Sequence, residues 1–546
     1  MAIKGSFSVT GNIVDVINQR VFKGTIHVIN GKIASIEAGP VLENQYILPG
    51  LIDAHVHIES SMLLPAEFAR LAVVHGTVAT VSDPHEIANV LGIEGINFMI
   101  ANGKKSPFKF FFGAPSCVPA TPFETSGAKL EVADTEALLA QPDIWYLSEM
   151  MNFPGVIAKD PEVIAKLAAA RKSGKPVDGH APGVLGENAR LYAQAGITTD
   201  HECFTLEEAL DKIKWGMKVL IREGSAARNL DTLLPLLTDH SAEIMFCSDD
   251  KHPDDLVKGH INLLVKRAIA KGYDPLQIIR ACTLNPIKHY NIPVGLLRPG
   301  DDADFIIIDN LSDFNIKATY IRGLKVAENG QTLINGVPET ILNKFLARPI
   351  TEADLRVKAS SGNVKVQKAL EGQLITEAIY LKPLIVNDLV ESDTAHDILK
   401  MMVMNRYAPS SPAVNFILGF GLKRGAIAST VAHDSHNIIA VGTSDVDIVT
   451  AVNLLVAAKG GIALADGDKT SLLPLPVAGL MSDNDGYEVA RRYEEINELA
   501  KALGSPLASP FMTLSFMALL VIPALKLSDK GLFDGNTFQF TSLFDK

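Results

Sequence analysis

Apolar runs with the length of buried strands alternate with amphipathic stretches from residue 47 to residue 272. The apolar runs are ILPGLIDAHVH, TVATVSD, FKFFFGAP, IWYLSE, PVDGH, ITTDH, MKVLIRE and EIMFCSD. Stretches with helical spacing lie between most of them, among them PAEFARLAVVHG, DPEVIAKLAAARKSG and LEEALDKIKWG, and DDLVKGHINLLVKRAIAKG closes the series. Because strands that alternate with helices form parallel β/α units, eight such units predict a (β/α)8 TIM-like barrel over residues 48–297.

Two β-rich segments flank this barrel region. The first 47 residues contain the strand-like runs SFSVTGNIVDV, GTIHVIN and KIASIEA, with a hairpin turn expected at Asn30-Gly31. Similar runs return at residues 302–309 (DADFIIID) and 318–330 (ATYIRGLKVAENG). We therefore expect residues 1–47 and 298–345 to pair into one small β-sandwich domain, with the barrel inserted between them.

A third region begins near residue 350. GAIASTVA and NIIAVGT have the pattern of strands, and DVDIVTAVNLLVAAKGG has that of a helix. This pattern predicts a separate C-terminal α/β domain over residues 350–546, so the whole chain belongs to the α/β class.

Composition narrows the class of protein. With 47% hydrophobic and 21% charged residues among 546, the chain is a globular protein and not a disordered one. A net charge of -12 disfavours general nucleic-acid binding, which needs an excess of cations. The longest apolar run near the C-terminus, residues 516–525, is too short to span a membrane, and no secretory signal is visible. Four widely separated cysteines are typical of reduced thiols, so we expect a cytoplasmic enzyme.

Several of the predicted strands end in side chains that bind metal ions. His55 and His57 lie two residues apart, so both imidazoles point to the same face of a strand. Further candidates follow other strands: Glu149, His180, His201 and the pair Asp249-Asp250. The carboxyl ends of barrel strands meet at one face, and nitrogen and oxygen ligands without thiolate suit Zn, Fe or Mn. Four histidines and two carboxylates would hold two metals roughly 3.5–4 Å apart.

The run DPHEIANVLG after the second strand has two interpretations. Asp83 followed by Pro84 at the first helical position is a good helix start. Alternatively, Asp83, His85 and Glu86 orient metal ligands or contact the substrate, and the same holds for Glu59 and Asp250. The sequence leaves both interpretations open.

Longer motifs resemble those of one family. LPGLIDAHVHIESSMLLPAEFA, GTVATVSDPHEIANVLG, YLSEMMNFPGV, DGHAPGV, TTDHE and FCSDDKHPDDL are similar to the motifs of the bacterial adenine deaminases, within the amidohydrolase superfamily. The resemblance extends to VAHDSHNIIAVGTSDVD in the third region. It implies hydrolysis of adenine to hypoxanthine and ammonia by a metal-activated hydroxide, a purine salvage reaction.

The same resemblance implies roles for single residues. It makes four histidines metal ligands, Glu149 the bridging carboxylate and Asp249 the strand-eight aspartate that transfers protons; the histidines are His55, His57, His180 and His201. Asp250 remains an alternative to Asp249. The resemblance implies Mn2+ or Fe2+, whereas the ligand types alone also allow Zn2+. A homodimer or larger homo-oligomer is expected, without nucleic-acid or membrane partners.

The sequence also allows other interpretations of the function. One is a superfamily hydrolase that acts on a different aminated heterocycle or on a cyclic amide, although no lysine stands in YLSEMMNF to bridge metals as in hydantoinase-like relatives. Another is an inactive, oligomerising scaffold. His85 or a protonated Glu59 could donate a proton to the substrate. His433, Asp434 and His436 either close the barrel mouth, bind a further metal, or form an ordinary strand-end turn.

Overall fold

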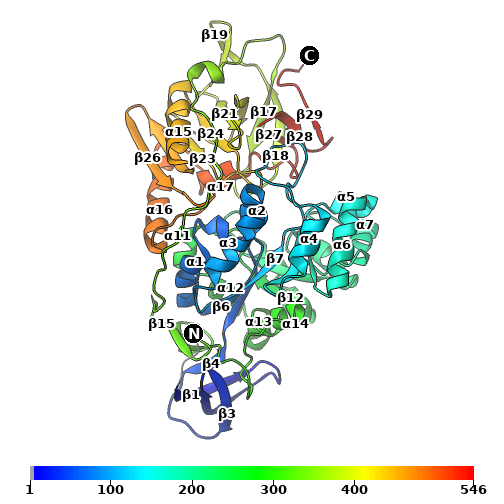
Figure 1. The fold of residues 1–546 in the computed structure, drawn as a ribbon, viewed down its shortest axis with the longest axis vertical. Coiled ribbons are helices and arrows are strands. Elements are labelled where there is room, and N and C mark those ends of the chain that lie inside the picture. Colours follow the sequence, from blue (N-terminus) through cyan, green and yellow to red (C-terminus); the bar gives the residue numbers. More distant parts are fainter. Residues whose placement is uncertain (1–4, 546) are drawn as a thin grey trace.

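The structure is a computed structural model that describes residues 5–545. The first four residues of the predicted segment 1–47, and Lys546 at the end of the predicted segment 350–546, lie outside the described residues. The molecule is elongated, with the N-terminal strands at one end, the parallel strands and their helices in the middle, and the C-terminal residues at the other end (Figure 1).

The middle of the molecule is built on eight parallel strands. They form two sheets with strand orders β5-β6-β7-β8-β9 and β10-β11-β12. Their bounds are β5 Leu51–Val56, β6 Thr77–Ser82, β7 Lys109–Ala114, β8 Ile144–Met150, β9 Val177–Gly179, β10 Thr199–Asp200, β11 Lys218–Arg222 and β12 Ile244–Cys247.

Backbone hydrogen bonds also join these two sheets. Thr198 N donates to Val177 O at 2.8 Å beside β9, and Asp249 N donates to His55 O at 3.0 Å, between the end of β12 and β5. The sheet is therefore curled and TIM-like, as the alternation of strands and helices predicts.

Helices surround these strands. They are α1 Pro65–Ala72, α2 His85–Leu91, α3 Ile93–Gly103, α4 Val132–Leu139, α5 Phe153–Ala158, α6 Pro161–Ser173, α7 Gly186–Gln194, α8 Leu206–Lys214, α9 Leu230–Leu233, α10 Leu236–Asp239, α11 Pro253–Lys258, α12 Ile261–Ala270, α13 Pro275–Ala281 and α14 Leu284–Tyr290. Short 3-10 turns are η1 Ile58–Ser61, η2 Val73–His75, η3 Ser241–Glu243 and, beyond the barrel, η4 Glu352–Leu355. The ends of α6 show why the sequence is helical there. Asp160 caps its N-terminus, and Gly174 ends it with a φ of 70°.

The last predicted helical stretch is divided in two, α11 and α12. The break falls at Gly259 and His260, whose backbone is not helical. The His260 imidazole is instead bonded to Asp53 at 2.8 Å and to Thr77 at 2.7 Å. Because its imidazole is buried and bonded to Asp53 of β5, His260 has a structural role.

The two β-rich flanks form one sheet. Its strand order is β16-β15-β14-β13-β4-β1-β2-β3, so β4 and β13 join the N-terminal flank to the later one. The strands are β1 Ser6–Asp15, β2 Arg20–Ile29, β3 Lys32–Ala38, β4 Tyr46–Pro49, β13 Phe305–Ile308, β14 Ile316–Ile321, β15 Leu324–Glu328 and β16 Gln331–Thr332. Asn30 and Gly31, with φ of 51° and 77°, form the expected hairpin turn. The domain boundaries and the sandwich form stay predictions.

The C-terminal region contains a second eight-stranded sheet, of order β18-β17-β22-β21-β24-β23-β25-β26. Its strands are β17 Val364–Ala369, β18 Thr376–Leu381, β21 Leu399–Met404, β22 Ala413–Leu418, β23 Ala426–Ser429, β24 Ile438–Gly442, β25 Gly461–Asp466 and β26 Lys469–Pro474. Smaller strands are β19 Leu384–Val386, β20 Leu389–Glu391, β27 Leu525–Ser528, β28 Gly531–Asp534 and β29 Gln539–Phe540, and the helices are α15 Asp445–Ala458, α16 Gly486–Ala502 and α17 Pro510–Ser515. β23, β24 and α15 occupy the segments where the sequence predicts two strands and a helix.

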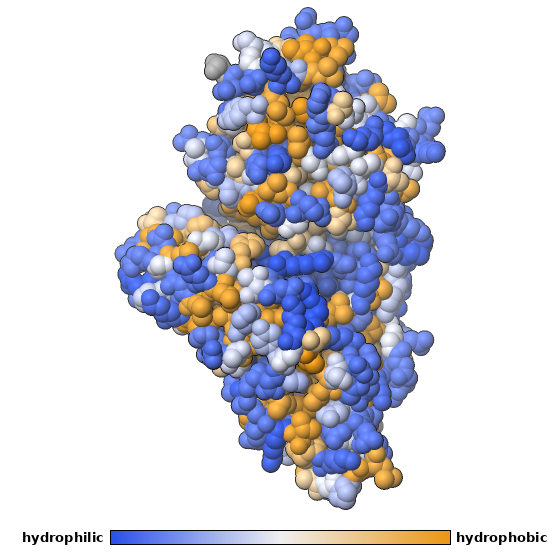
Figure 2. Space-filling view, turned by 180° about the vertical axis from the view of Figure 1, so that it is seen from behind, coloured by the Kyte–Doolittle hydropathy of each residue, from blue (hydrophilic) through white to orange (hydrophobic). Residues whose placement is uncertain are grey.

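The surface carries both hydrophilic and hydrophobic residues. In the space-filling view, hydrophilic residues cover most of the visible face, and hydrophobic residues form smaller groups between them (Figure 2). The apolar side chains of β19 are about half exposed, at 42% to 49%. Among the described residues, none of the helices has both the length and the hydropathy required to cross a membrane.

Candidate metal centre

The strand-end residues converge at the carboxyl ends of the parallel strands. His55 belongs to β5 and His57 follows it, Glu149 lies on β8, and the others directly follow or lie one residue beyond their strands: His180, His201 and Asp249. All are buried except His180, which is partly exposed. Asp249 has a φ of 55°, a left-handed conformation that turns the chain sharply after β12.

The first half of the centre is made by His55, His57 and Asp249. The two Nε2 atoms lie 3.2 Å apart, and Asp249 Oδ1 lies 3.6 Å from His55 Nε2 and 3.3 Å from His57 Nε2. His57 Nδ1 lies 3.2 Å from the backbone oxygen of Asp83. Because a carbonyl oxygen only accepts, Nδ1 carries the proton and Nε2 presents its lone pair to the other ligand atoms. This donor set fits a divalent cation.

The second half of the centre is made by His180 and His201, and Glu149 connects the two halves. Glu149 Oε2 lies 2.9 Å from His180 Nδ1 and 3.1 Å from His201 Nε2. Its other oxygen, Oε1, lies 3.5 Å from His57 Nε2 in the first half. One carboxylate therefore faces both sets of histidines, which is the geometry that a bridging ligand of two metals needs.

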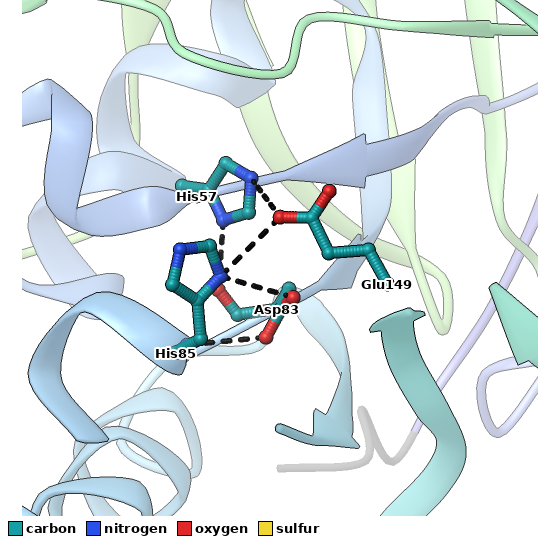
Figure 3. A group of neighbouring side chains, drawn as sticks. All are labelled: His57, Asp83, His85 and Glu149. Atoms are coloured by element: carbon teal, nitrogen blue, oxygen red, sulfur yellow. Dashed lines mark hydrogen bonds and ion pairs between the residues drawn. The ribbon is translucent and has the colours of Figure 1, made fainter. Parts of the chain in front are cut away.

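Asp83 and His85 lie directly beside this centre (Figure 3). His85 Nδ1 lies 3.1 Å from Asp83 Oδ2 and 3.4 Å from Glu149 Oε1. The helix start is confirmed, since α2 begins at His85. His85 also lies beside the candidate ligand Glu149, but the orienting or substrate-contacting role stays a prediction. The sequence predicts Pro84 as the first helical residue, whereas in the structure Pro84 is the N-cap and the helix begins one residue later, at His85.

The structure separates Asp249 from Asp250 by their contacts. Asp249 faces the histidines, whereas Asp250 accepts a hydrogen bond from Ser60 Oγ at 2.5 Å. Glu59 is buried, and its Oε1 accepts the backbone N–H of Ile87 at 3.1 Å. Burial raises the pKa of Glu59 to about 7. Glu59 does not line the cavity at the centre, whereas His85, Glu86 and Asp250 do.

Two charged residues of the centre were not among the sequence candidates, namely Arg222 and Glu202. Arg222 ends β11 and donates to both oxygens of Glu202, at 2.7 Å for Nη2, and to Asp249 Oδ2. Burial opposes ionisation of Asp249, but the Arg222 guanidinium and the histidines hold its pKa well below the usual range. Arg222 stands at the end of the seventh predicted strand, and Glu202 directly follows His201. These two positions, at a strand end and next to a candidate ligand, are the sequence features that could have indicated a role for Arg222 and Glu202.

Residues of the C-terminal region form the opposite wall of the cavity. His433 and His436 are bonded to the two oxygens of Glu86, and the His433 ring stacks on Phe516 with centroids 4.5 Å apart. Asp434, Leu519 and Ile522 also line the cavity. These residues lie across the end of the barrel, and Asp434 also lies close enough to His85 and Glu86 for the three to hold a metal, so closure of the barrel mouth and binding of a further metal both stay predictions. The free space is about 30 Å3, room for only a few water molecules, so a larger ligand requires the wall to move outward.

Comparison with known proteins identifies related sequences along the whole chain. The Amidohydrolase family matches residues 46–326, and the Adenine deaminase C-terminal domain matches residues 373–539. A protein named adenine deaminase from Salinibacter ruber is 53% identical over 541 residues, covering 99% of each chain. One of the same name from Methanosarcina mazei is 54% identical over 547 residues, covering 98% of this chain and 99% of the relative.

A less similar relative carries the same name. The adenine deaminase of Borreliella burgdorferi is 48% identical over 542 residues and covers 98% of this chain and 99% of its own. A crystal structure of D-hydantoinase aligns with a TM-score of 0.46 at 14% identity, over 60% of this chain and 96% of that one. On the full-length sequence relationships, the chain belongs to the adenine deaminase family of the amidohydrolases.

Proposed function

We propose that this chain hydrolyses adenine to hypoxanthine and ammonia, with a pair of divalent metal ions. The observation that carries the proposal is the identity of about half of all residues with adenine deaminases over nearly the full length. The complete set of buried histidine and carboxylate ligands supports the same conclusion, because an inactive scaffold has no need to keep it.

The metal ligands we propose are four imidazoles and two carboxylates, namely His55, His57, His180, His201, Glu149 and Asp249. Two groups of three within this set, His55-His57-Asp249 and His55-Glu149-His201, have ligand atoms within 4.8 Å of one another and support it. His180 comes equally close to His201 in a group that also contains Glu202. Mn2+ or Fe2+ are the proposed ions, with Zn2+ compatible with the same ligands. When bound, two such ions would lower the pKa of a water molecule far below that of bulk water, to about 7, and so supply a nucleophile at neutral pH.

Asp249 is placed to move protons during the reaction. Its Oδ1 faces the histidines, while Arg222 holds Oδ2 and fixes the plane of the carboxylate. Oδ1 accepts the proton of the water that attacks C6 of adenine and transfers it to the departing amino group. Arg222 keeps this carboxylate ionised, and Glu202 holds the guanidinium in place before substrate arrives.

A second proton must reach the ring nitrogen next to C6. His85 lines the cavity, and its Nδ1 lies 3.1 Å from Asp83 Oδ2, which orients the ring. Glu59, the other candidate donor, does not line the cavity. We therefore propose His85 for this role, with Asp83 as the residue that orients it.

We also propose the domain boundaries, the location and the oligomeric state of the chain. The eight strands and their connecting bonds support a closed (β/α)8 barrel over residues 48–297, a β-sandwich over residues 1–47 and 298–345, and a C-terminal α/β domain over residues 350–546. A cytoplasmic location and a homodimer or larger homo-oligomer are further proposals. Four buried free cysteines support the first of them.

An ammonia-release assay tests the activity. The purified chain, supplied with Mn2+ or Fe2+, should release ammonia from adenine with a kcat/KM at least about 100-fold above that for guanine or cytosine, because the site must pair with one particular ring edge. Hydantoin is the comparison substrate for cyclic-amide hydrolysis. Ring opening of hydantoin without ammonia from adenine would assign the chain to a different reaction within the amidohydrolases.

A further inference from the structure

One carboxylate of the C-terminal wall has no role in the chemistry described so far. Asp434 is only 3% exposed and lines the cavity opposite the metal centre. Its Oδ1 lies 3.5 Å from His85 Nε2. Its Oδ2 is buried and has no hydrogen-bond partner among residues 5–545.

An unpaired carboxylate oxygen in a buried position is costly. A carboxylate only accepts hydrogen bonds, so the partner that Oδ2 lacks must be a donor. Buried polar atoms are nearly always paired in folded proteins, and an exception that faces a cavity marks a place for a ligand. Oδ2 of Asp434 therefore fits the N–H group of a molecule that occupies the cavity.

Adenine carries two kinds of N–H donor. The amino group on C6 leaves in the reaction, so it must face Asp249 and the metal ligands. The remaining donor is the N–H of the imidazole ring, on the other side of the purine. It is therefore available to the wall that faces the metal centre, where Asp434 lies.

Resting on the proposed function, we propose that Asp434 accepts a hydrogen bond from the imidazole N–H of adenine and thereby selects the free base over purines substituted at that nitrogen. A nucleoside has no hydrogen there and brings a carbon atom toward the carboxylate. Its binding would leave Oδ2 buried and unpaired. Asp434 is thus a specificity-determining residue.

The rest of the wall suits the flat faces of a purine. Phe516, Leu519 and Ile522 supply apolar surface beside Asp434, and the His433 ring is held parallel to Phe516, with an interplanar angle of 13°. Lys526 Nζ donates to the backbone oxygens of Phe516 and Leu374, at 2.9 and 2.8 Å. These bonds hold the backbone at Phe516 and Leu374 together, so this part of the wall stays intact when it moves outward to admit a ligand.

The test compares two ligands that differ at the imidazole nitrogen. KM and kcat are measured for adenine, and the inhibition constant is measured for 9-methyladenine, in the wild type and in Asp434→Ala and Asp434→Asn. Loss of a hydrogen bond to a charged group should lower kcat/KM for adenine about 10- to 100-fold in Asp434→Ala, mainly through KM. The preference for adenine over 9-methyladenine should fall at least about tenfold, with Asp434→Asn intermediate.

Glu124→Gln is the matched control. Glu124 is 4% exposed, both of its carboxylate oxygens lack partners among residues 5–545, and it does not line the metal-centre cavity. Burial and, after it, the negative charge of nearby Asp434 raise the pKa of Glu124 well above its usual range, so the amide replaces a neutral acid of the same shape beside the tested carboxylate. This variant should retain wild-type kinetics and the wild-type preference for adenine.

Different results indicate failure of the Asp434 role and failure of the proposed adenine deamination. Unchanged adenine kinetics in Asp434→Ala, or equal losses for adenine and 9-methyladenine, would overturn the selection role. If Asp434→Ala does not fold, the preference for adenine over 9-methyladenine is compared between the wild type and the near-isosteric Asp434→Asn, and an unchanged preference would overturn the selection role. A wild-type enzyme that releases no ammonia from adenine would instead refute the activity itself.

Discussion

Asp249→Asn should lower kcat for adenine by about 100- to 10,000-fold, the range that positioned proton transfer contributes. The amide keeps the size of the side chain and one oxygen toward His57, but it accepts no proton from the attacking water. Arg222 retains Glu202 as a partner, so the local fold should persist. The measurement is steady-state ammonia release, normalised to the metal content of each preparation.

Asp250→Asn is the matched control for this prediction. It changes the neighbouring, partly buried carboxylate, which also lines the cavity but accepts a hydrogen bond from Ser60 Oγ. Its effect on kcat should be far smaller than that of Asp249→Asn. A near-normal rate for Asp249→Asn with full metal content would remove Asp249 from proton transfer, and a larger loss at Asp250 would exchange their roles.

Glu149→Gln should reduce the bound metal from two ions per chain to about one or fewer, and lower kcat/KM by at least about 1,000-fold. Glu149 presents one oxygen to His57 and the other to His180 and His201. An amide offers one good acceptor oxygen and no negative charge, so it cannot serve both halves. Metal content by elemental analysis and activity should fall together.

Glu59→Gln serves as the control for metal content. Glu59 is also a buried glutamate at this end of the strands, but it bonds to the backbone of Ile87 and not to a candidate ligand. It should retain both metal ions. Two ions per chain in Glu149→Gln would show that the carboxylate does not bridge them.

Much of the centre could be predicted because it follows from strand geometry. His55 and His57 share a face through the two-residue period of a strand. The other predicted ligands are brought to the same place because barrel strands end at one face. Asp249 and Asp250 could not be separated in this way, since the left-handed turn at Asp249 decides which carboxylate points inward.

The contacts between distant segments could not be predicted. Arg222 is one of several basic residues near strand ends, and only the folded chain places it between Glu202 and Asp249. His433 lies almost 350 residues from Glu86, its partner, so neither periodicity nor spacing indicates the pair. The break between α11 and α12 depends on the His260 contact with Asp53, which is also long-range.

Six side chains from the ends of five strands should hold two cations. Anomalous diffraction from crystals of the Mn2+-loaded protein measures this most directly. Two peaks are expected, one next to His55, His57 and Asp249 and one next to His180 and His201, with Glu149 between them. A single peak elsewhere, or these side chains without any ion after loading, would contradict this expectation.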